Sequence, residues 1–325
     1  MLSSRKLFPL INAANVASGL LNKNLVREPE DLEKFIDFSS GIPILIPADS
    51  EVFLFRKTDV FTLKHEILLE TVYGHQEKDY VGFRHAFKSS EFLSEYEVKD
   101  KWKPLIADII SQNEAASEHV YSLKVAGLTV GAFQTRNIPH FGHEKIMSRM
   151  LDHCDHLVIN PVLGPKKKGD ATLECLRDIF SNFYNNKFTG RITFKPLIAN
   201  MFYAGPREAV HHAQMRKSLG FDLFSVGRDH AGASGIYPPD AAMNVVKSLN
   251  YSLGIDVMCH SGAVFCNSCN SVVLRDECAH SDAVKGDISG TKFRECLASK
   301  SLFEFADCSL QEYLFAKKIK VFEDD

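Results

Sequence analysis

The sequence predicts an α/β protein organised around a parallel sheet, on three observations. From residue 121 onward, short apolar runs alternate with longer helix-like stretches, an order that favours a parallel sheet with right-handed crossovers. Hydrophobic residues make up 45% and charged residues 24%, the balance of an ordinary globular protein. The length of 325 residues corresponds to about two domains, and the first 122 residues differ in pattern from the rest. We therefore expect a domain built on a parallel sheet, preceded by a small β-rich domain.

Residues 1–122 are expected to form this small β-rich domain, with a helical connector. Short apolar runs bounded by Gly, Pro or Asp are typical of strands, whereas the charged stretch of residues 88–118 is helix-prone. The expected strands are residues 43–47, 52–55 and 61–63.

Residues 123–255 are expected to form the parallel-sheet domain, and residues 256–325 a cysteine-rich insertion followed by a short helical region. The expected strands are residues 123–133, 156–159, 192–194 and 223–226, and the expected helices are residues 141–152, 171–185 and 206–219. Ligands of such sheets bind beyond the carboxyl ends of the strands. The polar residues that follow the strands are therefore candidates for a functional site.

The charge balance argues against a wholly basic surface. Lys and Arg total 38 against 41 Asp and Glu, so the net charge of -3 disfavours nucleic acid or an anionic membrane as a partner, although a local basic site stays open. No stretch approaches the ~20 apolar residues that span a bilayer. Asn12, Asn15 and Asn22 interrupt the apolar N-terminal run, so no secretory signal is expected. The 8 cysteines are sparse, and a reducing cytoplasm is the expected location.

The strongest chemical motif lies in residues 134–143, directly after the first strand of the sheet. His140 and His143 are three positions apart and can point from one face of the first turn of a helix. Free N–H groups and the helix dipole make a phosphate site there, and two imidazoles can donate to phosphoryl oxygens. Gly142 lets a ligand approach the backbone, and Arg136 offers a planar fork to an oxyanion. Two unrelated helix-surface histidines are the alternative.

These residues resemble a known family. Residues 140–143 (His-Phe-Gly-His) are similar to the signature of the HIGH-type nucleotidyltransferases, and residues 134–137 (Gln-Thr-Arg-Asn) resemble the ATP sulfurylase (sulfate adenylyltransferase) family. Further blocks that resemble this family are residues 160–170, 203–209, 226–232 and 288–294. The resemblance implies a Rossmann-like nucleotidyltransferase domain behind a PUA-like N-terminal domain. It also implies the reaction of ATP and sulfate to adenylylsulfate and pyrophosphate, in sulfate assimilation or in sulfur oxidation.

By this resemblance, a sulfate oxygen attacks the α-phosphorus of ATP in line, with Mg²⁺ bridging the β- and γ-phosphates. The catalytic residues implied are Arg136, Asn137, His140, His143 and Arg228. The ATP-binding residues implied are Gln134, Thr135, Asn137, His140, His143, Gly227, Arg228, Asp229, His230, Ser289 and Thr291. The sulfate-binding residues implied are Gln134, Arg136, Arg228 and Ala231. A flexible cationic lid over pyrophosphate is expected at Lys166, Lys167 and Lys168.

Several of these assignments have structural alternatives. A buried ion pair would account for Arg228 and Asp229. Ser289 and Thr291 would serve as helix caps. The lysine run of residues 166–168 would be a solvated charged loop.

The chain departs from the family pattern in a few places. Ile138 separates Asn137 from a proline that usually follows directly, although the spacing to His140 is kept. Residues 201–203 (Met-Phe-Tyr) stand where the family commonly has an arginine, which puts one anion or ATP contact in doubt. The N-terminal region is short, and the sequence after residue 300 matches poorly. Since no Walker-type loop occurs, no fused adenylylsulfate kinase is expected.

Cys266, Cys269, Cys278 and His280 form a second constellation. Soft thiolates with one imidazole at this spacing favour a tetrahedral structural zinc site, here a zinc knuckle, and some ATP sulfurylases carry a similar cysteine cluster. Four protein ligands leave no open coordination position, so no catalysis is expected from it. Reduced structural cysteines are the alternative, with residues 259–260 (Cys-His) as substitutes or bystanders.

Two other functions stay open. A related HIGH-type nucleotidyltransferase would act on a different oxyanion or a phosphorylated acceptor. A non-enzymatic RNA-binding module would use the PUA-like domain and the knuckle, but the charge balance and the lack of a basic–aromatic strip weigh against it. The expected partners are ATP, sulfate, pyrophosphate and adenylylsulfate, with no nucleic acid and no membrane. A homo-oligomer is implied by the resemblance alone.

Overall fold

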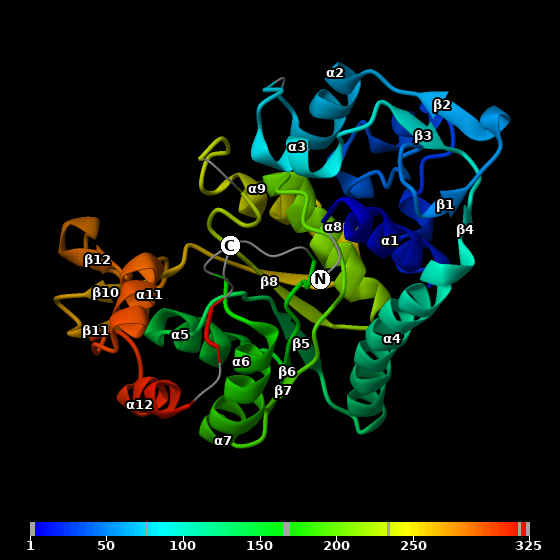
Figure 1. The fold of residues 1–325 in the computed structure, drawn as a ribbon. Coiled ribbons are helices and arrows are strands. Elements are labelled where there is room, and N and C mark those ends of the chain that lie inside the picture. Colours follow the sequence, from blue (N-terminus) through cyan, green and yellow to red (C-terminus); the bar gives the residue numbers. More distant parts are fainter. Residues whose placement is uncertain (1–3, 76, 165–169, 233–234, 318–319, 323–325) are drawn as a thin grey trace.

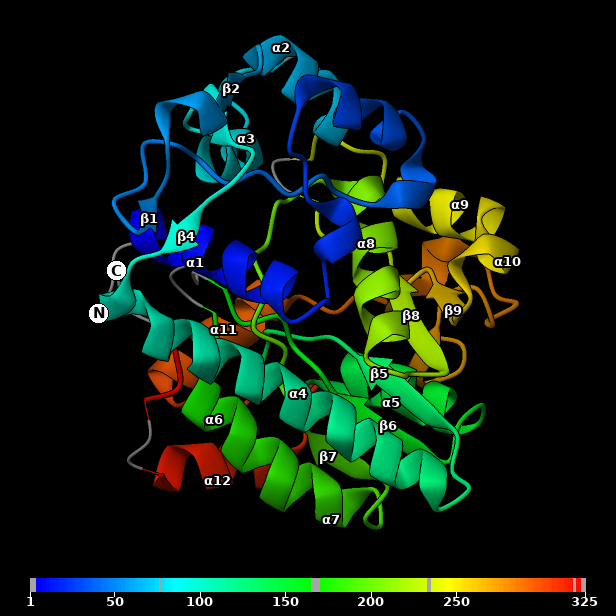
Figure 2. The same ribbon diagram turned by 90° about the vertical axis from the view of Figure 1, so that its right-hand side faces the viewer.

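A computed structural model describes residues 4–75, 77–164, 170–232, 235–317 and 320–322 (Figures 1 and 2). Within these residues, five strands form one parallel sheet in the order β7-β6-β5-β8-β9. The strands are β5 (Val130–Phe133), β6 (His156–Ile159), β7 (Ile192–Phe194), β8 (Leu223–Gly227) and β9 (Asp256–His260). The α/β class is confirmed, as are the predicted strands of residues 156–159, 192–194 and 223–226. The edge strand β9 is not predicted by the sequence.

The first strand is shorter than predicted. Helix α4 runs from Lys103 to Val125, so the residues expected to begin the strand complete a long helix instead. Gly127, with a φ of 83°, turns the chain after the helix, and β5 starts at Val130. The prediction failed because a short apolar run does not by itself distinguish a helix end from a strand.

Helices cover both faces of the sheet, since alternate strand residues face opposite layers. Leu157 and Ile159 pack in one core cluster with α5 and α6, whereas Val158 and Phe224 pack in another with α8 and α9. The helices are α5 (Phe141–Leu151), α6 (Leu173–Asp178) with a π turn at Ile179–Tyr184 and α7 (Asn185–Lys187), α8 (Gly205–Ser218), α9 (Ala241–Ser248) and α10 (Asn250–Leu253). The three predicted helices of this domain are therefore confirmed, with small shifts at their ends.

The order of the strands creates a topological switch point between β5 and β8. The chain runs outward from β5 to β6 and β7, and then returns to place β8 on the other side of β5. In open α/β sheets, ligands bind beyond the carboxyl ends of the strands at such a point. The loops after β5 and β8 are therefore the natural site.

The N-terminal region has more helix and less strand than predicted. Its elements are α1 (Ser4–Ala17), 3-10 turns at Asn22–Asn24, Pro29–Phe35, Phe38–Ser40, Lys57–Asp59 and Asp100–Trp102, β1 (Phe53–Leu54), β2 (Val60–Thr62), α2 (His65–Leu68) with a π turn at Leu69–Tyr73, α3 (Val81–Ala86), β3 (Glu91–Leu93) and β4 (Glu97–Val98). Residues 43–47 form only isolated bridges at Ile44 and Pro47, because Pro43 and Pro47 lack the N–H that a strand ladder needs. The long helix begins at Lys103, because the residues before it supply β3 and β4.

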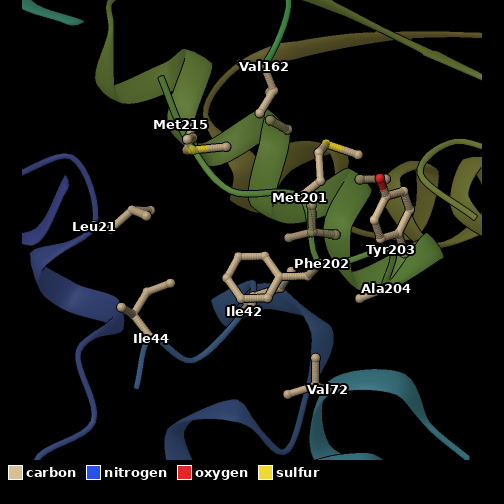
Figure 3. Packing of buried hydrophobic residues seen from close by; sticks show 14 of the residues in the cluster. Leu21, Ile42, Ile44, Val72, Val162, Met201, Phe202, Tyr203, Ala204 and Met215 are labelled. Carbon is tan, nitrogen blue, oxygen red and sulfur yellow. The ribbon is translucent and has the colours of Figure 1, made fainter. Parts of the chain in front are cut away.

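This region shares a hydrophobic core with the sheet domain. Ile42, Ile44 and Val72 belong to the same cluster as residues 201–204, and Figure 3 shows these side chains together. Arg207 of α8 is buried and donates to three main-chain carbonyls of the N-terminal region. Helix α1 also packs along α4 (Figure 2). The N-terminal region thus supports the segment that precedes α8.

The cysteine-rich segment forms a small antiparallel sheet, in the order β11-β10-β12, that packs against α5. Its strands are β10 (Ala263–Cys266), β11 (Ser271–Leu274) and β12 (Lys285–Asp287), separated by a 3-10 turn at Asp282–Val284 and followed by α11 (Gly290–Ser299) and α12 (Cys308–Ala316). No helix among the described residues is both long and apolar enough to cross a bilayer.

Candidate functional site

The predicted phosphate site lies at the N-terminus of α5, directly after β5. His140 is the N-cap residue, and its Nδ1 accepts a hydrogen bond from the Gly142 N–H at 3.1 Å. His143 Nδ1 accepts from the His140 N–H at 3.3 Å, which completes a reciprocal capping box. The two ring centroids are 4.1 Å apart. The histidines are therefore one unit at the start of a helix, not two separate surface side chains.

The capping bonds determine which imidazole nitrogen can serve a ligand. Because Nδ1 of each ring accepts a backbone N–H, the neutral ring carries its proton on Nε2. Burial lowers the pKa of His140 from 6.5 to about 4. Burial, together with His140 and His260 nearby, holds the pKa of His143 well below 6.5. Both rings are neutral at pH 7, and each has one Nε2–H that is not used by the cap.

Two glycines make room for histidine rings, Gly142 in the first turn of α5 and Gly227 at the end of β8. A Cβ on Gly142 would lie 2.8 Å from the His140 ring, and a Cβ on Gly227 would lie 2.8 Å from the His260 ring. His260 Nε2 is hydrogen-bonded to Ser225 Oγ at 3.1 Å, and burial lowers the pKa of His260 to about 4. His260 thus packs beside β8 and stands apart from the cysteine cluster.

Arg136 lies between a carboxylate and a tyrosine ring. Its Nη1 is 3.3 Å from Asp170 Oδ2, and its guanidinium carbon is 5.9 Å from the centroid of Tyr203. Close to it in sequence, Gln134 has a buried side-chain oxygen without a hydrogen-bond partner among the described residues. The Gln134 oxygen is an acceptor, so the donors that these two side chains offer a small anion are the amide N–H groups of Gln134 and the guanidinium of Arg136.

The rest of this loop is shaped by its own backbone. Thr135 is buried, and its hydroxyl accepts the Asn137 N–H at 3.2 Å. Asn137 itself is exposed. Thr135 therefore holds the turn, while the Asn137 side chain is accessible to a ligand.

The loop after β8 follows an unusual backbone path. Asp229 and Ala231 have positive φ values of 56° and 52°, which few non-glycine residues adopt. The Asp229 N–H donates to Pro239 O at 2.7 Å, and Ala231 O accepts from the Gly205 N–H at 3.2 Å. Arg228 and Asp229 are both exposed and form no ion pair with each other, so the predicted alternative of a buried pair is wrong. The exposed Arg228 is free to meet an anion from solvent.

A fully buried carboxylate, Glu208, organises the segment around Tyr203 and lies beside a pair of buried histidines. Glu208 accepts the two backbone N–H groups that flank Tyr203, at 2.8 and 2.9 Å. Its Oε1 also lies 3.4 Å from Nε2 of His212. His212 Nδ1 is in turn hydrogen-bonded to Nε2 of His230 at 3.0 Å. Glu208 thus holds the backbone on both sides of Tyr203, whose ring faces Arg136, while His212 contacts the loop after β8 through His230.

The remaining candidates lie on α11 and in the lysine loop. Ser289 is the N-cap residue of α11 and accepts a backbone N–H at 3.2 Å, so its predicted capping role is confirmed. Thr291 accepts a hydrogen bond from an arginine of the same helix at 3.1 Å. Phe293 brings α11 to the site, with its ring centroid 6.3 Å from that of His140. Lys166, Lys167 and Lys168 lie outside the described residues.

The cysteine cluster converges on one point. The ligand atoms of Cys266, Cys269, Cys278 and His280 all lie within 4.8 Å of one another. His280 Nδ1 is 3.5, 3.3 and 3.6 Å from the three sulfurs, and the Cys269 and Cys278 sulfurs are 3.9 Å apart. A tetrahedron around zinc with Zn–S of ~2.3 Å has edges of ~3.8 Å. The donor set and its spacing therefore fit zinc.

Comparison with known proteins places the chain in a family. A model of the ATP-sulfurylase family matches residues 116–303. The chain belongs to the ATP-sulfurylase family. A sulfate adenylyltransferase of Staphylothermus marinus is 31% identical over 323 residues, which cover 91% of this chain and 84% of that protein. Another, of Aeropyrum pernix, is 41% identical over 170 residues, which cover 52% of this chain and 44% of that protein.

Among solved structures, a chain described as "Hexameric APS kinase from Thiobacillus denitrificans" aligns with a TM-score of 0.47 and 15% sequence identity. The alignment covers 62% of this chain and 39% of that chain.

The departures from the ATP-sulfurylase pattern are accommodated in the core. Ile138 is buried in the cluster that contains α5 and α6, and the cap at His140 is kept. Phe202 is also buried and packs edge-on against Phe8, with ring centroids 5.4 Å apart. An apolar ring therefore occupies a place where an arginine is common in the ATP-sulfurylase family.

Several residues that support the candidate site are not predicted by the sequence patterns. Asn15 Nδ2 donates to Ile198 O at 3.1 Å, and Asn200 Nδ2 donates to Asn12 Oδ1 at 2.7 Å, so α1 holds the chain that leads to Tyr203. The signal in the sequence is the pair of amides Asn12 and Asn15, which are three positions apart and so lie on one face of the helix. From the sequence alone they are only polar interruptions of an apolar run. For Glu208, the buried carboxylate of α8, the only signal in the sequence is its position inside the block of residues 203–209 that resembles the family.

The buried imidazoles predict that this ATP-sulfurylase family member loses stability in acid. Burial lowers the pKa of His140 and His260 to about 4 and that of His211 to about 3, from 6.5 in each case. The unfolded chain therefore binds more protons in this range, and the stability that is complete above pH 6.5 falls as the pH drops toward 4. We expect the Tm at constant ionic strength to fall steeply across that window. A flat Tm would contradict burial of neutral imidazoles.

Proposed function

We propose that the chain is a sulfate adenylyltransferase, which converts ATP and sulfate to adenylylsulfate and pyrophosphate. The observation that carries the proposal is the capping box of His140 and His143, with two neutral Nε2–H donors at a helix N-terminus that Arg136 precedes. The relatives of that name, which are 31% and 41% identical, support it.

In this proposal the loops after β5 and β8 together hold both substrates. Sulfate is held by Gln134, Arg136, Arg228 and the backbone of Ala231. ATP is held by Gln134, Thr135, Asn137, His140, His143, Gly227, Arg228, Asp229, His230, Ser289 and Thr291, with Lys166, Lys167 and Lys168 over the pyrophosphate. A sulfate oxygen attacks the α-phosphorus opposite the departing pyrophosphate, without a covalent enzyme intermediate. The protein contributes positioning, and the Nε2–H groups donate to phosphoryl oxygens as their negative charge grows.

Mg²⁺ enters this proposal with the nucleotide. It neutralises the β- and γ-phosphates and usually keeps several waters, so it does not require a dedicated cage of protein ligands. Among the described residues, the cysteine cluster is the one group of three or more His, Cys, Asp or Glu side chains positioned to hold a metal ion. In this proposal Mg²⁺ would therefore be held mainly by the phosphates of ATP and by water.

Structural zinc at Cys266, Cys269, Cys278 and His280 is a further part of the proposal. Since β10 and β11 pack on α5, zinc would brace the helix that carries the phosphate site. We expect about one zinc per chain by elemental analysis, and a fall in Tm of about 5 °C or more after chelation or in Cys278→Ser. Cys308→Ser, at an exposed cysteine outside the cluster, is the matched control and should change neither value. An unchanged Tm in the zinc-free protein would argue against a structural role.

The domain division and the assembly also belong to the proposal. The division is at residues 1–122, 123–255 and 256–325, with a PUA-like fold in the first part supported by the antiparallel pairs β1–β4 and β2–β3. A cytoplasmic location fits thiolate ligands, which persist in a reducing compartment. A homo-oligomer follows from the family resemblance.

A second candidate function is transfer to a different oxyanion or to a phosphorylated acceptor. Phe202 favours it, because the arginine that is common at this place would contribute a positive charge that this chain lacks. The deciding experiment is coupled pyrophosphate release from ATP, with sulfate, without sulfate, and with a panel of phosphorylated metabolites. Sulfate-dependent release supports the first proposal, and release that needs a phosphorylated acceptor supports the second. No release under any condition would overturn both.

A further inference from the structure

The C-terminal segment lies beyond the family match, yet it is docked on the sheet domain. The match ends at residue 303, and α12 follows it. Tyr313 and Lys317 contact Asp178 at 2.8 and 3.1 Å through the hydroxyl and the ammonium group. These contacts join α12 to the end of α6.

Beyond α12, the tail of residues 320–322 pairs with the two residues that precede α6. The Thr172 N–H donates to Val321 O at 2.9 Å, and Thr172 Oγ1 donates to Lys320 O at 2.6 Å. Ala171 and Phe322 form an antiparallel bridge. In Figure 1 the red tail accordingly runs close to the start of α6. Thr172 and its neighbour are therefore held from one side by main-chain pairing with the tail.

The same short segment is bonded to Arg136 on its other side. The Ala171 N–H donates to Arg136 O at 3.1 Å, and Asp170 Oδ2 lies 3.3 Å from Arg136 Nη1. The side chains of Asp170 and Arg136 are 13% and 27% exposed, so solvent and salt screen this pair less than a surface pair. A carboxylate on one nitrogen of the planar guanidinium orients the whole fork.

We propose that the tail of residues 320–322 is a positioning element for Arg136. It holds residues 171–172 in place, and these place the Asp170 carboxylate against the guanidinium. The inference rests on the proposed function, in which Arg136 binds sulfate. Because the capping box at His140 makes no contact with the tail, losing the tail weakens sulfate binding and leaves ATP binding unchanged.

The test compares deletion of residues 320–325 with Asp170→Asn in the otherwise complete chain. Each change is expected to raise the KM for sulfate about tenfold, as the loss of one charge-assisted hydrogen bond would, and to keep the KM for ATP within about twofold. Combining the two changes should weaken sulfate binding no further than Asp170→Asn alone, because both act through the same contact. Lys317→Met is the matched control. It removes the contact between residue 317, at the end of α12, and Asp178, keeps the tail of residues 320–322, and should leave the KM for sulfate unchanged.

Three results would overturn the proposal: an unchanged KM for sulfate after the deletion, an equal rise in both KM values, or additive effects in the combined variant. A tail that is merely structural would lower kcat through the folded fraction and leave the KM for sulfate unchanged. Calorimetric titration with sulfate, in the presence of a non-hydrolysable ATP analogue, reads sulfate binding without turnover. If the complete chain binds sulfate but releases no pyrophosphate, the proposed function fails, while the titration still decides the role of the tail.

Discussion

Replacing His140 or His143 with alanine is expected to lower the turnover number at least ~100-fold, because each change removes one donor to the charge that grows on the phosphoryl oxygens. The two rings are 4.1 Å apart at the N-terminus of α5, and burial keeps both neutral. They therefore act as hydrogen-bond donors and not as cations. Sulfate-dependent pyrophosphate release by the purified variants measures the effect.

His140→Asn separates the cap from the chemistry. Asparagine is among the best N-cap residues, so its side chain can accept the Gly142 N–H and keep the stability that His140→Ala loses, about 1 kcal/mol. It has no donor at the place of Nε2, so turnover should stay as low as in His140→Ala. If either alanine variant is folded and releases pyrophosphate at a near-normal rate, the histidine that it lacks has no role in the reaction.

Replacing Glu208 with alanine is expected to lower the free energy of unfolding by about 3 kcal/mol, because two buried backbone N–H groups lose their acceptor. Burial raises the pKa of Glu208, whereas its backbone hydrogen bonds act in the opposite direction. Turnover should fall as well, since Glu208 holds the backbone on both sides of Tyr203, whose ring faces Arg136. Urea unfolding gives the free energy, and pyrophosphate release the turnover.

A glutamate on the surface provides the comparison for Glu208. Glu174 is exposed in the first turn of α6, and Glu174→Gln should change the unfolding free energy by less than about 0.5 kcal/mol. Glu208→Gln keeps the volume of the side chain, but its amide N–H group then faces one of the two backbone N–H groups, which leaves that group without an acceptor. We therefore expect it to lower the free energy of unfolding nearly as much as Glu208→Ala does. A loss below about 1 kcal/mol in both Glu208 variants would show that the carboxylate does not organise the site.

The parallel sheet could be predicted closely, and the N-terminal region could not. Strands β6 and β7 and helix α5 have clear local signals, which are short continuous apolar runs and an amphipathic stretch behind an N-cap. β9 was missed because its polar ends, Asp256 and His260, obscure a short edge strand. Residues 43–47 have the apolar character of a strand, but their prolines and their packing against residues 201–204 prevent a ladder.

The local pattern of the chain was sufficient for the family, the class of fold and the capped turn at the start of α5, because caps, spacing and apolar periods are properties of neighbouring residues. The neutral state of His140 and His143 depended on tertiary structure, because burial sets their pKa. So did the path from the tail to Arg136, whose contacts join residues far apart in the chain. Such pairings leave no local signal, since each residue shows only its own polarity until folding brings its partner within hydrogen-bond distance.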